Sequence, residues 1–245
     1  MRKLELAALA GLIVLIGAWM AWVPTAGAQN SAAPTGVSSA SSGSEAGNGT
    51  NLVVVQEDVL VPLIGEPEQF FRRARRDFNS GRRRAAAREI RAAGALIELE
   101  AGRHDAQNKS GLDQSANQLK QLAAGVQDGS VKSVNQLDRA FAQADLALAR
   151  HYHDMAANYQ GSDHGKVGRW LQAAANSVSG AASWSKQKLS AGGKSTVSEA
   201  RKLGNQIESG TGWAADKVGK SLSGLGQEIS RLSGASGSSS ASSNQ

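Results

Sequence analysis

The chain has 245 residues, no cysteine and a formal net charge of +6, from 27 lysines and arginines against 21 aspartates and glutamates. The lack of cysteine excludes a disulfide framework, a cysteine-ligated metal site and a cysteine nucleophile. The 28 glycines follow no period, which excludes collagen, and a single long apolar run excludes a polytopic membrane protein. With 40% hydrophobic but only 4% aromatic residues, the composition favours close-packed helices.

The N-terminus has the pattern of an export signal. Two basic residues precede an apolar stretch at residues 6–23, and small residues lead to a cleavage point between Ala28 and Gln29. The alternative is an uncleaved membrane anchor, because an apolar stretch of this length nearly spans a bilayer. We therefore expect a signal peptide at residues 1–28 and a periplasmic or secreted protein.

The composition also divides the rest of the chain. Residues 29–50 and 233–245 are rich in Ser, Gly and Ala. They have too little apolar surface to offset the entropy lost on ordering, so both segments should be disordered. The valine-rich residues 51–64 should form an extended arm, since their proline limits any strand to an edge. We predict a helical-hairpin core domain at residues 51–160 and a looser amphipathic helical extension at residues 161–232.

The first hairpin of the predicted core begins at Pro67, which suits the first turn of a helix because it has no N–H to leave unpaired. The first helix has an apolar stripe of Phe70, Ala74 and Phe78, and a turn at residues 79–81 follows. A second helix should cover residues 82–102, with a buried face of Ala86, Ile90, Ala93 and Ile97, flanked by Leu96 and Ala101.

The second hairpin has the clearer spacing. Residues 112–126 place apolar side chains at alternating steps of four and three: Leu112, Ala116, Leu119, Ala123 and Val126. Residues 131–159 keep the three–four rhythm that is typical of a bundle seam, with Val134, Leu137, Phe141, Ala144, Leu148, His151 and Met155. These two helices should pair, which gives an all-α protein built from helical hairpins.

The extension is less regular. We expect helices at residues 164–190, 196–208 and 212–232, with a break at Gly192 and Gly193. The last segment contains three glycines, each of which costs about 1 kcal/mol relative to alanine inside a helix, so it needs a partner surface. Docking on the bundle is one use of its apolar face, and an interfacial membrane helix is the alternative.

The first hairpin resembles a single tetratricopeptide repeat. The family's order of aromatic, small, turn glycine, small, large and small residues is matched by Phe70, Ala74, Gly81, Ala86, Ile90 and Ala93. Arg73 and Asp77 depart from the pattern, and an array needs three or more repeats, so the resemblance implies only a closely packed hairpin.

The export signal, the alanine-rich hairpins and the lack of cysteine are also similar to exported YfdX-type proteins. That resemblance implies a helical protein associated with bacterial stress responses.

Nine arginines lie within residues 72–91, opposed by two acidic residues, for a local net charge of +7. They are Arg72, Arg73, Arg75, Arg76, Arg82, Arg83, Arg84, Arg88 and Arg91. A guanidinium group binds carboxylates and phosphates through paired N–H groups, so this cluster is the candidate contact for a protein partner or an acidic envelope component. An anionic membrane surface is the alternative ligand, and the scarcity of base-stacking aromatics disfavours nucleic acid. A solvated helix face with internal ion pairs is the non-functional interpretation.

Motifs for catalysis or metal binding fail on geometry. His151 and His153 are two residues apart, which puts them about 200° apart on a helix, so they cannot share an ion. We expect His151 to be buried in the seam and His153 to face solvent. Residues 191–196 (AGGKST) resemble the end of a phosphate-binding P-loop, but Lys188 replaces its first glycine and no strand precedes it, so a loop is predicted.

These observations lead to an expectation of function. We expect an exported, non-enzymatic helical protein of the cell envelope with an interaction or structural role, linked to stress. No cofactor and no metal are expected, because none of the candidate catalytic or metal-binding motifs has the residue spacing that its chemistry requires. The alternative is a peripheral protein that binds an anionic membrane through the arginine-rich hairpin and a C-terminal amphipathic helix.

Overall fold

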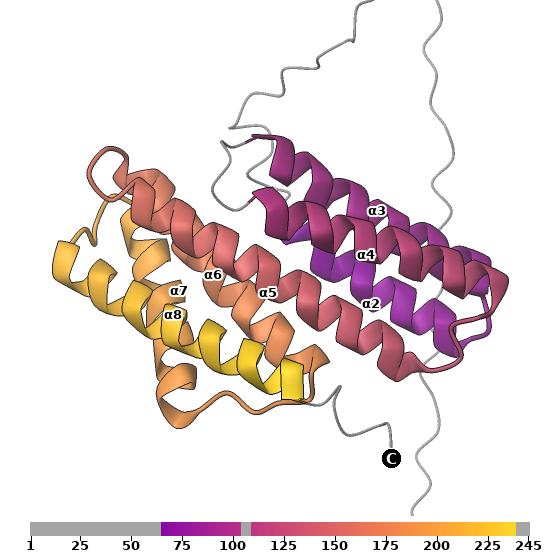
Figure 1. The fold of residues 1–245 in the computed structure, drawn as a ribbon. Coiled ribbons are helices and arrows are strands. Elements are labelled where there is room, and N and C mark those ends of the chain that lie inside the picture. Colours follow the sequence, from indigo (N-terminus) through magenta and orange to yellow (C-terminus); the bar gives the residue numbers. More distant parts are fainter. Residues whose placement is uncertain (1–64, 104–108, 239–245) are drawn as a thin grey trace, which may run out of the picture. The chain divides into compact units, whose positions relative to one another are not determined.

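A computed structural model describes residues 65–103 and 109–238 of the chain (Figure 1). Over these residues the chain forms helices and no strands, which confirms the predicted all-α helical bundle. The helices are α2 (Glu66–Asn79), α3 (Arg83–Arg103), α4 (Lys109–Asp128), α5 (Val134–Asn158), α6 (His164–Trp184), α7 (Ala191–Glu208) and α8 (Ala215–Ser238). The predicted signal peptide, linker and extended arm lie outside the described residues, as do residues 239–245 of the predicted tail.

The long helix α5 lies between two groups of helices, with α2, α3 and α4 on one side and α6, α7 and α8 on the other (Figure 1). Its start is fixed by a capping box, in which the Ser133 hydroxyl accepts from the Asn135 N–H at 3.1 Å and Gln136 Oε1 accepts from the Ser133 N–H at 3.2 Å. The predicted seam residues are buried, with the exception of Val134, which is partly exposed.

The buried faces of α3 and α4 are those that their spacing predicts. Every residue of the 112–126 pattern is at most 2% exposed, and Ala86, Ile90, Ala93 and Ile97 are fully buried. The predicted pairing needs one adjustment, because α4 packs more extensively along α3 than along α5. Gly94 of α3 lies at this contact, and a Cβ atom there would be 3.5 Å from the Ala116 carbonyl oxygen and from the Leu119 Cβ atom of α4.

The predicted apolar stripe of α2 is wrong by one residue at its first position. Phe71 is fully buried, whereas Phe70 is only partly buried. The reason is aromatic packing: the Phe71 ring stacks on Phe141 of α5, with centroids 4.4 Å apart, and meets the edge of Trp184 of α6 at 6.4 Å. Phe70 instead lies under the guanidinium group of Arg73, 4.3 Å from its carbon atom.

Helices α5 and α6 share one apolar core, so the helices before and after residue 160 are packed together. Trp170 and Trp184 of α6 are both buried, and the Trp170 ring stacks on Tyr152 of α5 at 5.6 Å. Helix α6 ends at Trp184, earlier than the predicted residue 190.

The predicted break at Gly192 and Gly193 is also wrong, because both glycines lie in the first turn of α7. The Ser190 hydroxyl caps this helix by accepting from the Gly193 N–H at 2.8 Å. The chain therefore turns at residues 185–190, where α6 has already ended.

Two other glycines allow α6 and α7 to cross closely. A Cβ atom at Gly168 would lie 2.7 Å from the Gly204 carbonyl oxygen, and one at Gly204 would lie 2.6 Å from the Gly168 carbonyl oxygen. Residues that lower the helical propensity of this region thus provide the space for its packing.

Helix α8 packs back against α5, α6 and α7 and continues past residue 232. Its apolar face is buried: Val218 and Leu225 are fully covered, and Leu222, Ile229 and Leu232 are at most 7% exposed. His153 of α5 holds this helix by a contact of 3.1 Å between its Nε2 atom and the Leu222 carbonyl oxygen. In the part of the chain that the structure describes, no helix has the length and apolarity needed to cross a membrane.

Candidate functional site

The structure divides the nine arginines of the α2–α3 hairpin into paired and exposed groups. Four of them form ion pairs within the chain: Arg72 with Glu68 at 2.9 Å, Arg73 with Glu89 at 2.8 Å, Arg75 with Asp138 at 2.9 Å and Arg82 with Asp77 at 2.6 Å. The acidic partners in these four pairs compensate the positive charge of four of the nine arginines.

The remaining five arginines have no ion pair with any described residue and are all exposed. They are Arg76, Arg83, Arg84, Arg88 and Arg91. Arg91 donates to the neutral amide of Gln127, so its charge is not cancelled. Arg84 and Arg88 lie one turn apart on α3 and project on the same face. The uncompensated positive surface of the hairpin therefore centres on α3 and the end of α2.

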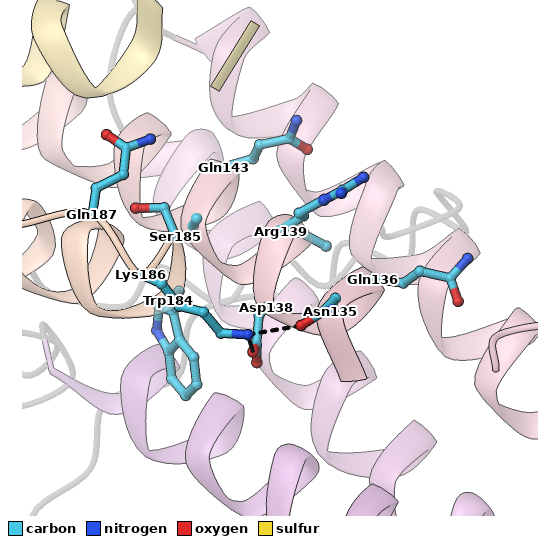
Figure 2. Close-up of a pocket in the computed structure, with 11 residues that line it drawn as sticks. Asn135, Gln136, Asp138, Arg139, Gln143, Trp184, Ser185, Lys186 and Gln187 are labelled. Carbon is cyan, nitrogen blue, oxygen red and sulfur yellow. Dashed lines mark hydrogen bonds and ion pairs between the residues drawn. The ribbon is translucent and has the colours of Figure 1, made fainter. Parts of the chain in front are cut away.

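A second polar feature begins at Asp138 of α5, a buried carboxylate that the sequence analysis did not single out. Arg75 of α2 donates to both of its oxygens, at 2.9 and 3.5 Å. Lys186 Nζ lies 3.9 Å from Asp138 Oδ2 and donates to Asn135 Oδ1 at 2.8 Å (Figure 2). The charge of Asp138 is thus shared between two cations from different helices.

This network lies in a pocket of about 590 Å³ between the first half of α5 and the end of α6 (Figure 2). Polar and apolar atoms contribute about equally to its surface. The lining residues are Asn135, Gln136, Asp138, Arg139, Ala140, Ala142, Gln143, Trp184, Ser185, Lys186 and Gln187. Arg139 is exposed and has no ion pair with a described residue. The polar residues at 135, 136, 139 and 143 of α5 were the sequence feature that could have indicated this pocket. The residues that complete its lining, 184–187, are distant along the chain, so the sequence does not show that the two stretches meet.

Lys186 has an unusual backbone in this pocket, with a φ of 57°. It follows the last turn of α6 in the position that glycine usually fills in a Schellman motif. Here the Lys186 N–H donates to the Ser183 carbonyl at 3.2 Å and the Gln187 N–H donates to the Ala182 carbonyl at 3.0 Å. A left-handed conformation costs a residue with a side chain about 1–2 kcal/mol. Its neighbour Gln187 has a buried Oε1 with no hydrogen-bond partner in the described chain.

The histidines take two different places. His151 is buried as predicted, with Nε2 3.3 Å from Glu100 Oε1, and Arg103 Nη1 lies 3.2 Å from Glu100 Oε2. The prediction that His153 faces solvent is wrong, because its side chain is only 24% exposed. Its Nδ1 atom lies 2.8 Å from Asp154 Oδ1 and its Nε2 contacts α8, so it links two helices.

Two carboxyl groups, of which one is buried, lie together where α2, α5 and α6 meet. Asp145 is 3% exposed, and Glu68 accepts from the Trp184 indole N–H at 3.1 Å. Both carboxyl groups face Gly180, where a side chain would collide with Asp145. Burial raises the pKa of Asp145 well above its ordinary value, and the neighbouring charge of Glu68 raises it further.

Residues 191–196 are the first six residues of α7 and not the predicted loop. An acidic side chain of the same chain covers the start of this helix, because Glu228 of α8 accepts from the Ser190 N–H at 3.1 Å and from its hydroxyl at 3.0 Å. The hydrogen bond from Arg231 is the main reason that the pKa of Glu228 is lowered. The helix end that resembles a phosphate-binding motif is therefore occupied by a carboxylate of the protein.

Among the described residues, no group of three His, Asp or Glu side chains is arranged to hold a metal ion. Glu98, the other acidic residue near Glu100, pairs with Lys120 of α4 at 2.7 Å. No protein family, no curated protein and no solved structure is significantly similar to this chain.

Proposed function

We propose that this chain is an exported, non-enzymatic protein of the cell envelope, linked to stress, that binds an acidic macromolecular partner. The proposed contact is the α2–α3 hairpin, through Arg76, Arg83, Arg84, Arg88 and Arg91. The main support is that these five side chains remain exposed and uncompensated by acidic described residues after the internal ion pairs form. Export rests on the N-terminal sequence pattern.

The internal pairs favour a binding role over a merely solvated face. Arg73–Glu89 joins α2 to α3, and Arg75–Asp138 joins α2 to α5, so both arginines serve the packing of the hairpin. The other five make no such link to an acidic described residue. A rigid helix that holds several guanidinium groups on its exposed surface suits a partner with many carboxylate or phosphate groups.

The buried ionisable groups support a non-enzymatic role. Asp145 and His151 are enclosed in the core and do not line the pocket, and the one acid in the pocket, Asp138, is paired with Arg75. General acid–base catalysis needs a group within hydrogen-bond reach of a substrate, and these groups are used for packing.

The alternative, peripheral binding to an anionic membrane, would use the same hairpin together with α8. The burial of Val218, Leu222 and Leu225 weighs against insertion of α8, because its apolar face is already covered by the bundle. A membrane contact would therefore depend on the arginines alone.

The test compares two charge-matched variants of the mature chain. Arg76→Gln, Arg84→Gln and Arg88→Gln together remove the proposed contact. Lys202→Gln, Lys217→Gln and Lys220→Gln remove equal charge from exposed positions of α7 and α8. The probes are polyglutamate and vesicles that contain phosphatidylglycerol, each measured at several salt concentrations.

We expect the parent protein to bind polyglutamate with an affinity that falls as salt rises. The arginine variant should bind about tenfold more weakly, because three exposed pairs at about 0.5 kcal/mol each are lost. Equal losses in both variants would mean that only net charge matters and would contradict the proposed site. Binding to the vesicles but not to polyglutamate would replace the proposal by the membrane alternative. N-terminal sequencing of the exported protein tests the cleavage point before Gln29.

A further inference from the structure

The pocket between α5 and the end of α6 has the features of a binding site for a small molecule. Its volume of about 590 Å³ lies in the range of about 300–1,000 Å³ that is common for small-molecule sites. Residues of two separate stretches of chain, 135–143 and 184–187, line this space (Figure 2). Polar lining groups of this kind fix the orientation of a ligand.

The charges of the pocket select an anion. Arg139 has no ion pair with a described residue, and Lys186 lies 3.9 Å from Asp138. Asp138 is held by Arg75 through both oxygens and is also paired with Lys186, so among the described residues the charge of Arg139 stays uncompensated. The charged lining residues Asp138, Arg139 and Lys186 carry a net charge of +1, which a singly charged carboxylate balances.

The uncharged groups of the pocket indicate the rest of the ligand. The lining includes four side-chain amides: Asn135, Gln136, Gln143 and Gln187. Gln187 Oε1 is buried and accepts no hydrogen bond within the described chain. A buried acceptor without a donor is unfavourable, and a hydroxyl group of a ligand would supply the missing donor.

The backbone of Lys186 gives an independent reason to regard the pocket as functional. Residues held in a disfavoured backbone region cluster at binding sites, where the placement of the side chain offsets the strain. Glycine would form the same Schellman turn without strain, but it would not place an ammonium group beside Asn135. The side chain of Lys186 is 63% exposed, so its ammonium group can transfer from Asn135 to a ligand.

We propose that this pocket binds a small hydroxylated carboxylic acid of the sugar-acid type. Arg139 binds the carboxylate through its paired N–H groups, Lys186 adds a second positive charge, and the amides contact the hydroxyl groups. This site is separate from the five exposed arginines of the hairpin and does not depend on the proposed macromolecular contact.

The experiment measures binding by calorimetry with glucuronate as the probe, and with glucose, acetate and inorganic phosphate for comparison. Lys186→Gly and Arg139→Gln are the test variants, and Lys188→Ala, two residues along the same loop and outside the pocket, is the control. Thermal unfolding is recorded for each variant. The protein is the mature chain in solution.

We expect glucuronate to bind more tightly than glucose, acetate or phosphate, and each test variant to weaken this binding at least tenfold. The control should bind as the parent protein does. Lys186→Gly should unfold at an equal or higher temperature, which a merely structural role of this lysine would not produce. The proposal is overturned by an absence of glucuronate binding, by stronger binding of phosphate, or by an equal loss in Lys188→Ala. Arg139→Gln keeps the test decisive if Lys186→Gly lowers the stability.

Discussion

The carboxyl group of Asp145 on α5 lies beside that of Glu68 on α2, and both face Gly180 on α6. Glu68 has two other partners, Arg72 at 2.9 Å and the Trp184 indole N–H at 3.1 Å. Burial raises the pKa of Asp145, and the neighbouring Glu68 raises it further. Three helices therefore meet at a point whose charge depends on pH.

The free energy of unfolding should fall as pH rises because of this pair. The pKa of Asp145 is raised in the folded protein, so the native state binds more protons than the unfolded state between the ordinary value of 3.8 and the raised value. The stability is therefore greatest below the ordinary value and is lost as pH rises through the raised one. Urea unfolding at a series of pH values measures this slope.

Asp145→Asn should remove part of the slope, because an amide has no proton to lose and can still donate to Glu68. Asp216→Asn, at an exposed site in the first turn of α8, is the control and should leave the slope unchanged. A slope that is the same in the parent and in Asp145→Asn would show that this carboxyl does not control the pH dependence.

The crossing of α6 and α7 should be sensitive to one methyl group. Gly204→Ala would place a Cβ atom 2.6 Å from the Gly168 carbonyl oxygen, so the helices must separate, at a cost of about 1–3 kcal/mol. Gly219→Ala in α8 has nothing within 4 Å and should stabilise the protein by up to about 1 kcal/mol through helix propensity. Opposite signs in denaturant titrations would confirm this packing, and equal effects would contradict it.

The ion pair between α2 and α5 should contribute more than its surface neighbours. Arg75→Gln leaves the buried carboxylate of Asp138 with fewer hydrogen bonds and should cost about 1–3 kcal/mol. Arg76→Gln, one residue further along α2 and without an ion pair to a described residue, should change stability by less than about 0.5 kcal/mol. Adding Asp138→Asn to Arg75→Gln should recover part of the loss, and denaturant titrations of all four proteins check this.

The two adjacent phenylalanines of α2 should differ strongly. Phe71→Ala empties a fully buried site against Phe141 and should cost about 3–5 kcal/mol. Phe70→Ala removes a half-buried ring and a cation–π contact with Arg73, for a loss of about 1 kcal/mol. Unfolding temperatures in the opposite order would support the stripe that the sequence spacing predicted.

Regular spacing was sufficient to predict most of the fold. In α4 and α5 the apolar residues at helical spacing are buried, apart from Val134, so the 112–126 pattern and most of the α5 seam follow from the sequence. The error at Phe70 and Phe71 arose because two adjacent aromatics fit the same pattern. The choice between them depends on where Phe141 and Trp184 lie, and helical spacing does not contain that information.

The local features of the candidate sites were less predictable. Glycines at 192 and 193 indicate a turn by propensity, but the cap at Ser190 and the carboxylate of Glu228 favour a helix there, and both depend on tertiary contacts. The left-handed backbone of Lys186 could not be predicted from the sequence, because glycine is the residue that usually marks such a position. The arginine cluster was visible in the sequence, but the division into paired and exposed members required Asp138 and Glu89 to be located.

The carboxylate of Glu228 at the start of α7 has a practical consequence for work with shortened forms of this protein. A chain that ends before α8 would lose this carboxylate and would leave the Ser190 N–H and hydroxyl, at the start of α7, without their acceptor. Because helix N-termini attract anions, such a fragment should bind sulfate or phosphate more readily than the full-length protein. Anion binding seen only after truncation would be an artefact of the missing helix.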